Sequence, residues 1–168
     1  MGADKAEVSV GGRPMARVVA DALAAGGCHS VVAVGGAARS HGLPVVDDVA
    51  PGEGPLGAVL SVLESVVAAA DTGPVLVVSC DLPMLDAPTV SLLLDRAALG
   101  DADLVVATTD RLQPLVAVWS VGALGVVRHQ FAAGERSIRR VVPLLDVALV
   151  PVRPDAVRNV NTPADLPD

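Results

Sequence analysis

The feature that most constrains the fold is a set of three short apolar runs, at 31–34, 75–79 and 104–107. Hydrophobic residues in these runs are continuous rather than alternating, which is typical of strands covered on both faces, as in parallel sheets. A similar run at 116–119 predicts a further strand, which could be antiparallel to the others. These runs are too short to be helices of ordinary length, so a layered sheet is the expected framework.

Helical patterns lie between the apolar runs. Between 56 and 67, six apolar residues recur at i, i+3, i+4, i+7, i+10 and i+11, which places them on one helix face. An earlier helix is predicted to begin near Pro14 and to end at Gly26, and another to begin at Asp86 and Pro88. Strands that alternate with helices predict an α/β sheet with right-handed crossovers.

Charge and composition argue against several classes of partner. The net charge of −7 leaves no basic face of the kind that DNA or RNA phosphates require, so no nucleic acid is expected as a partner. Only Trp119 and Phe131 are aromatic, which excludes a base-stacking platform. Hydrophobic residues make up 52% of the chain, yet no stretch reaches the roughly 20 apolar residues of a membrane helix. No membrane association and a cytoplasmic location are therefore expected.

Cysteine and serine chemistry finds no support in the sequence. The two cysteines, Cys28 and Cys80, are far apart and belong to no pair with metal-ligand spacing, which argues against a disulfide scaffold and a zinc site. No G-x-S-x-G motif is present, and Cys80 has no identifiable histidine partner. Covalent catalysis through a serine or cysteine nucleophile is not expected.

Acidic residues follow the predicted strands, where ligands of open α/β sheets bind. Asp81 comes directly after the run 75–79, and a carboxylate there is well placed to hold Mg²⁺ against phosphate oxygens. Asp48 follows another short apolar run and precedes Gly54-Pro55-Leu56, where glycine backbone and a helix N-terminus could approach a nucleotide. The alternatives are a turn cap for Asp81 and an ordinary loop before a helix.

Other polar residues are weaker candidates. Lys5 could neutralise charge on a leaving group, or it could be a solvated terminal charge. Gln113 and Arg136 could meet an anionic substrate, the alternative being a solvated face. Asn159 and Asn161 precede a capped turn at 162–165 that predicts a short last helix, and their alternative role is turn hydrogen bonding.

The order of these signals resembles the MobA-like NTP transferase family, above all its molybdenum cofactor guanylyltransferases. The matching segments run along most of the chain: Met1-Gly2-Ala3-Asp4-Lys5, Gly12-Arg13-Pro14, Asp48 with Gly54-Pro55-Leu56-Gly57, Cys80-Asp81-Leu82-Pro83, Gln113-Pro114-Leu115, Gly134-Glu135-Arg136 and Asn159-Val160-Asn161-Thr162-Pro163. The C-D-x-P loop and the N-x-N-T-P end are the most specific of them.

The resemblance implies one nucleotidyltransferase domain over 1–168, with a Rossmann-like three-layer α/β/α fold, a mostly parallel sheet and the architecture of nucleotide-diphospho-sugar transferases. It implies Mg²⁺-dependent transfer of GMP from GTP to molybdopterin with release of pyrophosphate, and partners in cofactor synthesis or molybdoenzyme maturation. The implied site residues are Lys5 and Asp81 for catalysis, with Asp81 on the metal; Lys5, Asp48, Gly54, Pro55, Leu56 and Asp81 for the nucleotide; and Gln113, Arg136, Asn159 and Asn161 for the pterin substrate.

One departure concerns the opening motif. The family pattern L-A-G-G-x-S-x-R is absent, because the chain begins at the family's Met-Gly. We therefore expect that the first strand and the phosphate loop are missing, that the native protein is longer, and that these 168 residues alone have little transferase activity. The alternative functions are cytidylyl transfer or another MobA-like nucleotidyl transfer, a catalytically inactive nucleotide-binding relative, and a plain binding module.

Overall fold

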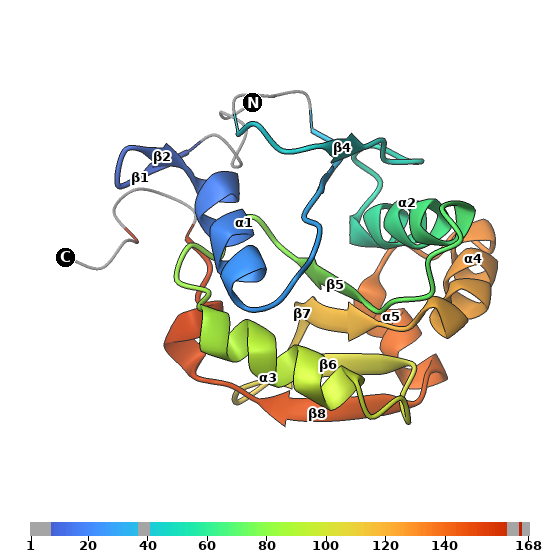
Figure 1. The fold of residues 1–168 in the computed structure, drawn as a ribbon. Coiled ribbons are helices and arrows are strands. Elements are labelled where there is room, and N and C mark those ends of the chain that lie inside the picture. The colour runs from blue at the N-terminus through green and yellow to red at the C-terminus, as the bar shows by residue number, and fades with distance from the viewer. Residues whose placement is uncertain (1–7, 37–40, 161–164, 166–168) are drawn as a thin grey trace.

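The computed structural model describes residues 8–36, 41–160 and 165 (Figure 1). Its strands are β1 (Ser9–Val10), β2 (Arg13–Pro14), β3 (Ala33–Val34), β4 (Val45–Val46), β5 (Val75–Val78), β6 (Leu104–Thr108), β7 (Leu112–Trp119) and β8 (Val147–Pro151). Its helices are α1 (Met15–Ala25), α2 (Pro55–Ala68), α3 (Ala87–Ala97), α4 (Leu124–Ala132) and α5 (Ile138–Val141), with 3-10 turns at Val121–Ala123, Val142–Leu144 and Pro154–Val157.

The strands form three separate sheets. Four strands pair in the order β5-β7-β6-β8, in which β7 is antiparallel to both neighbours and β6 is parallel to β8. The strands β3 and β4 pair in parallel, and β1 and β2 form a small antiparallel hairpin. Within the described residues, β5 and β3 therefore each have one edge that pairs with no other strand.

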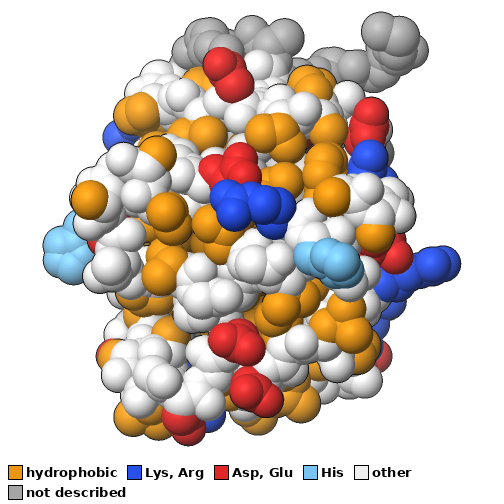
Figure 2. Space-filling model, turned by 90° about the vertical axis from the view of Figure 1, so that its right-hand side faces the viewer, with side chains coloured by type: hydrophobic (Ala, Val, Ile, Leu, Met, Phe, Trp, Pro, Cys, Tyr) orange, Lys and Arg blue, Asp and Glu red, His pale blue; other side chains and the backbone are white. Residues whose placement is uncertain are grey.

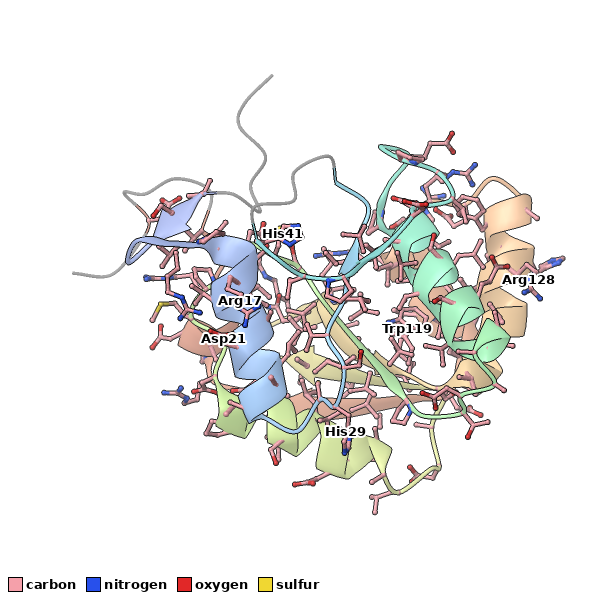
Figure 3. All side chains as sticks on the ribbon, turned by 45° about the horizontal axis from the view of Figure 1, so that its top comes forward. Arg17, Asp21, His29, His41, Trp119 and Arg128 are labelled. Atoms are coloured by element: carbon pink, nitrogen blue, oxygen red, sulfur yellow. The ribbon has the colours of Figure 1, made fainter. Side chains whose placement is uncertain are left out.

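Side-chain alternation along the central strands builds two cores. On β6, Leu104 and Val106 belong to a cluster with α2 and α4, whereas Val105 and Ala107 belong to a cluster with α1 and α3. Both faces of this strand are thus covered by helices, which explains its continuous apolar run. The arrangement confirms the predicted three-layer α/β fold. Trp119, labelled in Figure 3 beneath α2, lies in the first cluster and is fully buried.

The helix boundaries follow the predicted start and stop signals. The helix α1 begins directly after Pro14 and ends at Gly26, whose N–H donates to the carbonyl of Ala22. The carboxylate of Asp86 caps α3 by accepting a hydrogen bond from the N–H of Thr89, 3.0 Å away. Such a cap satisfies one of the N–H groups that a helix N-terminus leaves unpaired.

Some elements differ from the sequence-based expectations. The predicted strand at 31–34 is reduced to β3, because only Ala33 and Val34 pair with β4. The strand β8 and the helix α4 were not predicted. The strand β8 alternates between buried and exposed positions at the edge of the sheet, and α4 is interrupted in sequence by Gly125. The predicted helix at 162–165 lies almost wholly outside the described residues.

The surface on the α2 and α4 side carries charges of both signs among scattered hydrophobic side chains (Figure 2). One ion pair on these helices joins Arg128 of α4 to Glu64 of α2, with a nitrogen–oxygen distance of 3.0 Å. None of the described helices combines the length and apolar character needed to cross a lipid bilayer.

Candidate nucleotide-binding site

Asp81 lies three residues beyond the end of β5 and is almost completely buried, with 7% of its surface exposed. Its Oδ1 accepts a hydrogen bond of 2.6 Å from the hydroxyl of Ser79, and its Oδ2 accepts one of 3.0 Å from the amide Nδ2 of Asn159. Both carboxylate oxygens are therefore oriented by neighbouring side chains, which fixes the position of the charge at this end of the sheet.

The segment around Asn159 covers Asp81. The backbone N–H of Val160 donates to the carbonyl oxygen of Asp81 at 2.8 Å, and Val160 itself is fully buried. Two hydrogen bonds thus bind the segment 159–160 to Asp81. The structure brings together two residues that the sequence assigned to different substrates, since Asp81 was expected on the metal and Asn159 towards the pterin.

The groups around Asp81 fit a Mg²⁺ ion that is also bound by a nucleotide, and they do not fit a metal site made of protein side chains alone. Magnesium in nucleotide enzymes is held by one or two carboxylates together with substrate phosphates and water. Within the part of the chain that the structure describes, no three His, Cys, Asp or Glu side chains come together as a metal site. Each oxygen of an ionised carboxylate has a second lone pair. An ion could therefore share an oxygen of Asp81 with Ser79 or Asn159.

Asp48 is held between two glycines and the first turn of α2. A Cβ atom at Gly57 would lie 3.0 Å from its Oδ1, and one at Gly35 would lie 3.2 Å from its Cβ. Its Oδ1 also accepts a hydrogen bond of 2.9 Å from the N–H of Ala50. The carboxylate is consequently placed at the N-terminus of α2, where the helix dipole stabilises negative charge.

The loop that begins α2 is tied to the turn after α4. Gly54 has a φ of 113°, which favours glycine. A Cβ atom there would approach the carbonyl oxygen of Arg136 to 3.0 Å. That same carbonyl accepts a hydrogen bond of 3.3 Å from the N–H of Leu56. Pro55 occupies the first turn of α2 without a lost hydrogen bond. The three loop residues therefore depend on Arg136 for their position.

The guanidinium of Arg136 is also engaged within the protein. Its Nε donates to Glu53 at 2.7 Å, and its Nη1 donates to the carbonyls of Phe131 and Glu135 at 2.8 and 3.0 Å. The group lies 4.0 Å from the centroid of the Phe131 ring. These contacts fix the loop before α2 and hold the guanidinium against the protein.

Gln113 lies at the same end of the sheet as Asp81. The N–H of Ser79 donates to the carbonyl of Leu115 at 3.0 Å. Because β5 and β7 are antiparallel, Gln113, two residues before Leu115 on β7, lies at the end of the sheet where the chain leaves β5. Its Nε2 donates to the hydroxyl of Thr109 at 3.1 Å. The remaining predicted site residues, Lys5 and Asn161, lie outside the described residues.

A groove of about 1600 Å³ runs past the segments that lead to Asp48 and Asp81, although neither carboxylate lines it. Gly35, Gly36, Pro55, Ser79 and Cys80 all line it, so the ends of β3 and β5 and the start of α2 open into one space. His29 and His41, labelled beside α1 in Figure 3, also line it. A ligand in this groove would meet the positive end of α2 and the loop that leads to Asp81.

Several residues that shape the site were missed by sequence reasoning. Ser79 orients Asp81, Glu53 fixes Arg136, and Gly35 makes room for Asp48. The place of Gly35 at the end of a predicted strand is a signal that could have indicated a close approach of another segment. No sequence signal marks the contacts of Ser79 and Glu53, because a polar residue near a turn has many possible partners.

Comparison with protein families gives a match over residues 1–150 to the model described as "MobA-like NTP transferase domain". The chain belongs to the MobA-like NTP transferase family. It is 35% identical to the molybdenum cofactor guanylyltransferase of Rhodopseudomonas palustris, over 98% of this chain and 82% of that protein. It is 31% identical to the probable molybdenum cofactor guanylyltransferase of Opitutus terrae, over 86% of this chain and 72% of that protein.

A solved structure agrees with this membership. The molybdopterin-guanine dinucleotide biosynthesis protein A of Archaeoglobus fulgidus has a TM-score of 0.79 and 20% identity, over 98% of this chain and 87% of that chain. At this identity the likeness concerns the fold, which is that of nucleotide-diphospho-sugar transferases. As a MobA-like NTP transferase, the chain is a nucleotidyltransferase.

Proposed function

We propose that the protein transfers GMP from GTP to the phosphate of molybdopterin, with Mg²⁺ and with release of pyrophosphate. The observation that carries the proposal is the Asp81 carboxylate, fixed by Ser79 and Asn159 at the end of β5. Membership in a nucleotidyltransferase family and the names of relatives that are 31% and 35% identical supply the substrates. The work of such a site is positioning and charge compensation.

In the proposed reaction, an oxygen of the pterin phosphate attacks the α-phosphorus of GTP in line. The new phosphorus–oxygen bond forms as the bond to the β-phosphate breaks, and pyrophosphate leaves with the electron pair. Mg²⁺, when bound, offsets the negative charge of the converging phosphates. Asp81 would hold the ion, Ser79 and Asn159 would keep its carboxylate oriented, and no covalent enzyme intermediate is required.

The remaining roles are those that the family resemblance implies, adjusted to the contacts of the described residues. Asp48, half-buried beside the first turn of α2, would face the guanosine, and Gly54-Pro55-Leu56 would present the start of that helix to the nucleotide. Lys5 would neutralise the leaving phosphates. Gln113 and Asn161 would contact the pterin, while Arg136 and Asn159 would support the loop before α2 and Asp81, respectively.

The burial of Asp81 favours one alternative, a catalytically inactive relative that binds nucleotide without turnover. A carboxylate that is 7% exposed and bonded through both oxygens could serve only to hold the segment 159–160 in place. In that case Asp81→Asn would lower stability, and it would leave the Mg²⁺ dependence of nucleotide binding unchanged.

The test is pyrophosphate release with molybdopterin as acceptor, measured with GTP and with CTP separately, in Mg²⁺ and in EDTA. The 168-residue chain is assayed beside its Asp81→Asn variant. Release from GTP that requires Mg²⁺ supports the proposal. Release from CTP alone reassigns the base, and nucleotide binding without release supports the inactive alternative.

A further inference from the structure

The strand β7 carries an irregularity close to the turn that joins it to β6. Gln113 of β7 pairs with Ala107 of β6, whereas Ala117 pairs with the residue just before it, Val106. Residues 114–116 of β7 therefore have no partner on β6. Such a bulge bends the strand and re-aims its side chains, and bulges are common next to active sites. The bulge sets the direction of the Gln113 side chain, which contacts the turn between the two strands.

The hydroxyl of Thr109, in that turn, decides which atom of the Gln113 amide it contacts. Its Oγ1 lies 2.8 Å from the carboxylate Oδ1 of Asp110 and 3.5 Å from the carbonyl oxygen of Arg111, and neither of these groups can donate. The single hydroxyl proton goes to the carboxylate, because a hydrogen bond to an ionised group is the stronger kind. The hydroxyl can then only accept from Gln113, so the amide atom 3.1 Å away is the donor, Nε2.

The amide oxygen of Gln113 is consequently turned away from the turn. Nε2 and Oε1 branch from one planar carbon, so the oxygen points to the other side when Nε2 faces Thr109. Gln113 is half-buried. Among the described residues, the only fully buried side-chain nitrogen or oxygen without a partner is Nε1 of Trp119. Oε1 of Gln113 accepts no hydrogen bond from these residues, and it is therefore an acceptor that is open to solvent and to ligands.

This acceptor lies on the opposite side of the candidate metal ligand from Asp48. Gln113 lies at the same end of the four-stranded sheet as Asp81, and its strand β7 is the neighbour of β5. Asp48 follows β4, in the two-stranded sheet, and lies beside the first turn of α2. Figure 1 shows β4 and β7 on opposite sides of β5. If the nucleotide occupies the side of Asp48, the oxygen of Gln113 is on the side of the acceptor substrate.

We propose that Thr109 is a positioning residue for the acceptor substrate, because it holds the Gln113 amide so that Oε1 accepts a hydrogen bond from the amino group of a pterin ring. The choice of a pterin rests on the proposed function, whereas the geometry requires only a ligand with an N–H donor. A reversed amide would present a donor instead and would favour a ligand carbonyl. Guanine carries a similar amino group, so GTP is the other source of the same chemistry.

The test uses the 168-residue chain without nucleotide and two small probes. They are free pterin and 4-oxopteridine, the same ring without the amino group. NMR titration of the Gln113 side-chain amide measures the affinity for each probe. We expect pterin to bind about tenfold more tightly, which is the usual size of one hydrogen bond. Equal affinity of the unaltered chain for the two probes overturns the proposal.

Variants in the turn show whether the preference depends on Thr109. Thr109→Val removes the hydroxyl at constant shape and should abolish the preference, whereas Thr109→Ser keeps the hydroxyl and should retain it. Thr108→Val is the control in the same turn, because the Thr108 hydroxyl contacts the carbonyls of Thr109 and Arg111 and not Gln113. A preference that survives Thr109→Val, or that Thr108→Val abolishes equally, contradicts the positioning role.

A second variant decides the point if Thr109→Val does not fold. Asp110 is exposed, and Asp110→Ala frees the hydroxyl proton of Thr109, so that the Gln113 amide can reverse. We expect Asp110→Ala to reduce the preference for pterin over 4-oxopteridine. An unchanged preference in this variant would show that the hydroxyl does not set the direction of the amide.

Two further measurements separate the sources of the N–H group and the two proposals. Calorimetry with GTP should give the same affinity for Thr109→Val as for the unaltered chain. Lost GTP affinity with unchanged pterin binding would assign the contact to guanine and overturn the inference. A preference for pterin in a chain that releases no pyrophosphate would refute the proposed function and keep the inference. Pyrophosphate release without the preference would refute the inference alone.

Discussion

The amide of Asn159 donates a hydrogen bond to Oδ2 of Asp81 across 78 positions of sequence. This contact makes Asn159 a positioning residue for the candidate metal ligand. We expect Asn159→Ala to weaken Mg²⁺-dependent GTP binding by about 10–100-fold, as is usual when the partner of a metal ligand is removed. Titration calorimetry with and without Mg²⁺ measures it.

The same experiment separates positioning from pterin contact. If Asn159 contacts only the pterin, Asn159→Ala leaves GTP affinity unaltered in both conditions. Asp95→Asn is a suitable control, since Asp95 is exposed on α3 and its carboxylate takes no part in the site. A loss of affinity that is equal in Mg²⁺ and in EDTA would contradict the positioning role.

Arg136 joins the turn after α4 to the loop before α2, and its removal should cost stability. Arg136→Ala loses hydrogen bonds to two carbonyls and the stacking on Phe131, so we expect a loss of about 1–2 kcal/mol in the free energy of unfolding. Arg139→Ala, at an exposed position nearby, should stay within about 0.5 kcal/mol of the unaltered protein. Urea unfolding followed by Trp119 fluorescence measures the free energy of unfolding of both variants. Equal stability of the two would contradict the anchoring role of Arg136.

Gly26 allows α1 and α3 to approach closely. A Cβ atom there would lie 2.4 Å from the Cβ of Val90, so Gly26→Ala should destabilise the protein by about 1–3 kcal/mol. Gly125, inside α4, has open space around its Cβ position, and Gly125→Ala should stabilise the protein by about 0.5–1 kcal/mol. Thermal unfolding of the two variants should therefore shift in opposite directions, and a shift of the same sign in both would contradict this packing.

The cap of α3 should depend on pH. Hydrogen bonds from Thr89, together with Arg153, hold the pKa of Asp86 below its ordinary value. A depressed pKa in the folded state means that the stabilisation is present above the unfolded pKa of about 3.9 and is lost as the pH falls through the folded pKa. Asp86→Ala should cost about 1 kcal/mol at pH 7 and less below pH 3.

Asp86→Asn is the matched variant, because asparagine caps helices nearly as well as aspartate. It should keep most of the stability at pH 7, and its stability should vary less with pH than that of the unaltered protein. Denaturant unfolding at several pH values checks this. A cost for Asp86→Ala that grows as the pH falls would show that the ionised carboxylate does not stabilise the helix.

The fold was predictable from local signals wherever those signals are strong. The stripe at 56–67 predicted α2, Asp86 predicted a helix start, and the continuous run at 104–107 predicted a strand covered on both faces. The strand β8 was not predicted, because an edge strand buries fewer side chains and its apolar pattern is weaker. The contacts of Arg136 with Phe131 and Glu53 could not be predicted, because these residues become its neighbours only through packing.

The residues of the candidate site are a prediction from the sequence, whereas the contacts among them depend on packing. Asp81 was found from its place after a strand. Its burial under the segment at 159–160 depends on a contact between distant parts of the chain, which no local pattern contains. Asp48 is a candidate for the same reason as Asp81, and its fit between Gly35 and Gly57 depends on how the loops pack.

The most direct test of the central claim compares the unaltered protein with Asp81→Asn in pyrophosphate release from GTP, with molybdopterin as acceptor. We expect release that requires Mg²⁺ and falls by at least about a hundredfold in Asp81→Asn, while Asp95→Asn keeps the full rate. Release that continues undiminished in a folded Asp81→Asn protein would contradict it.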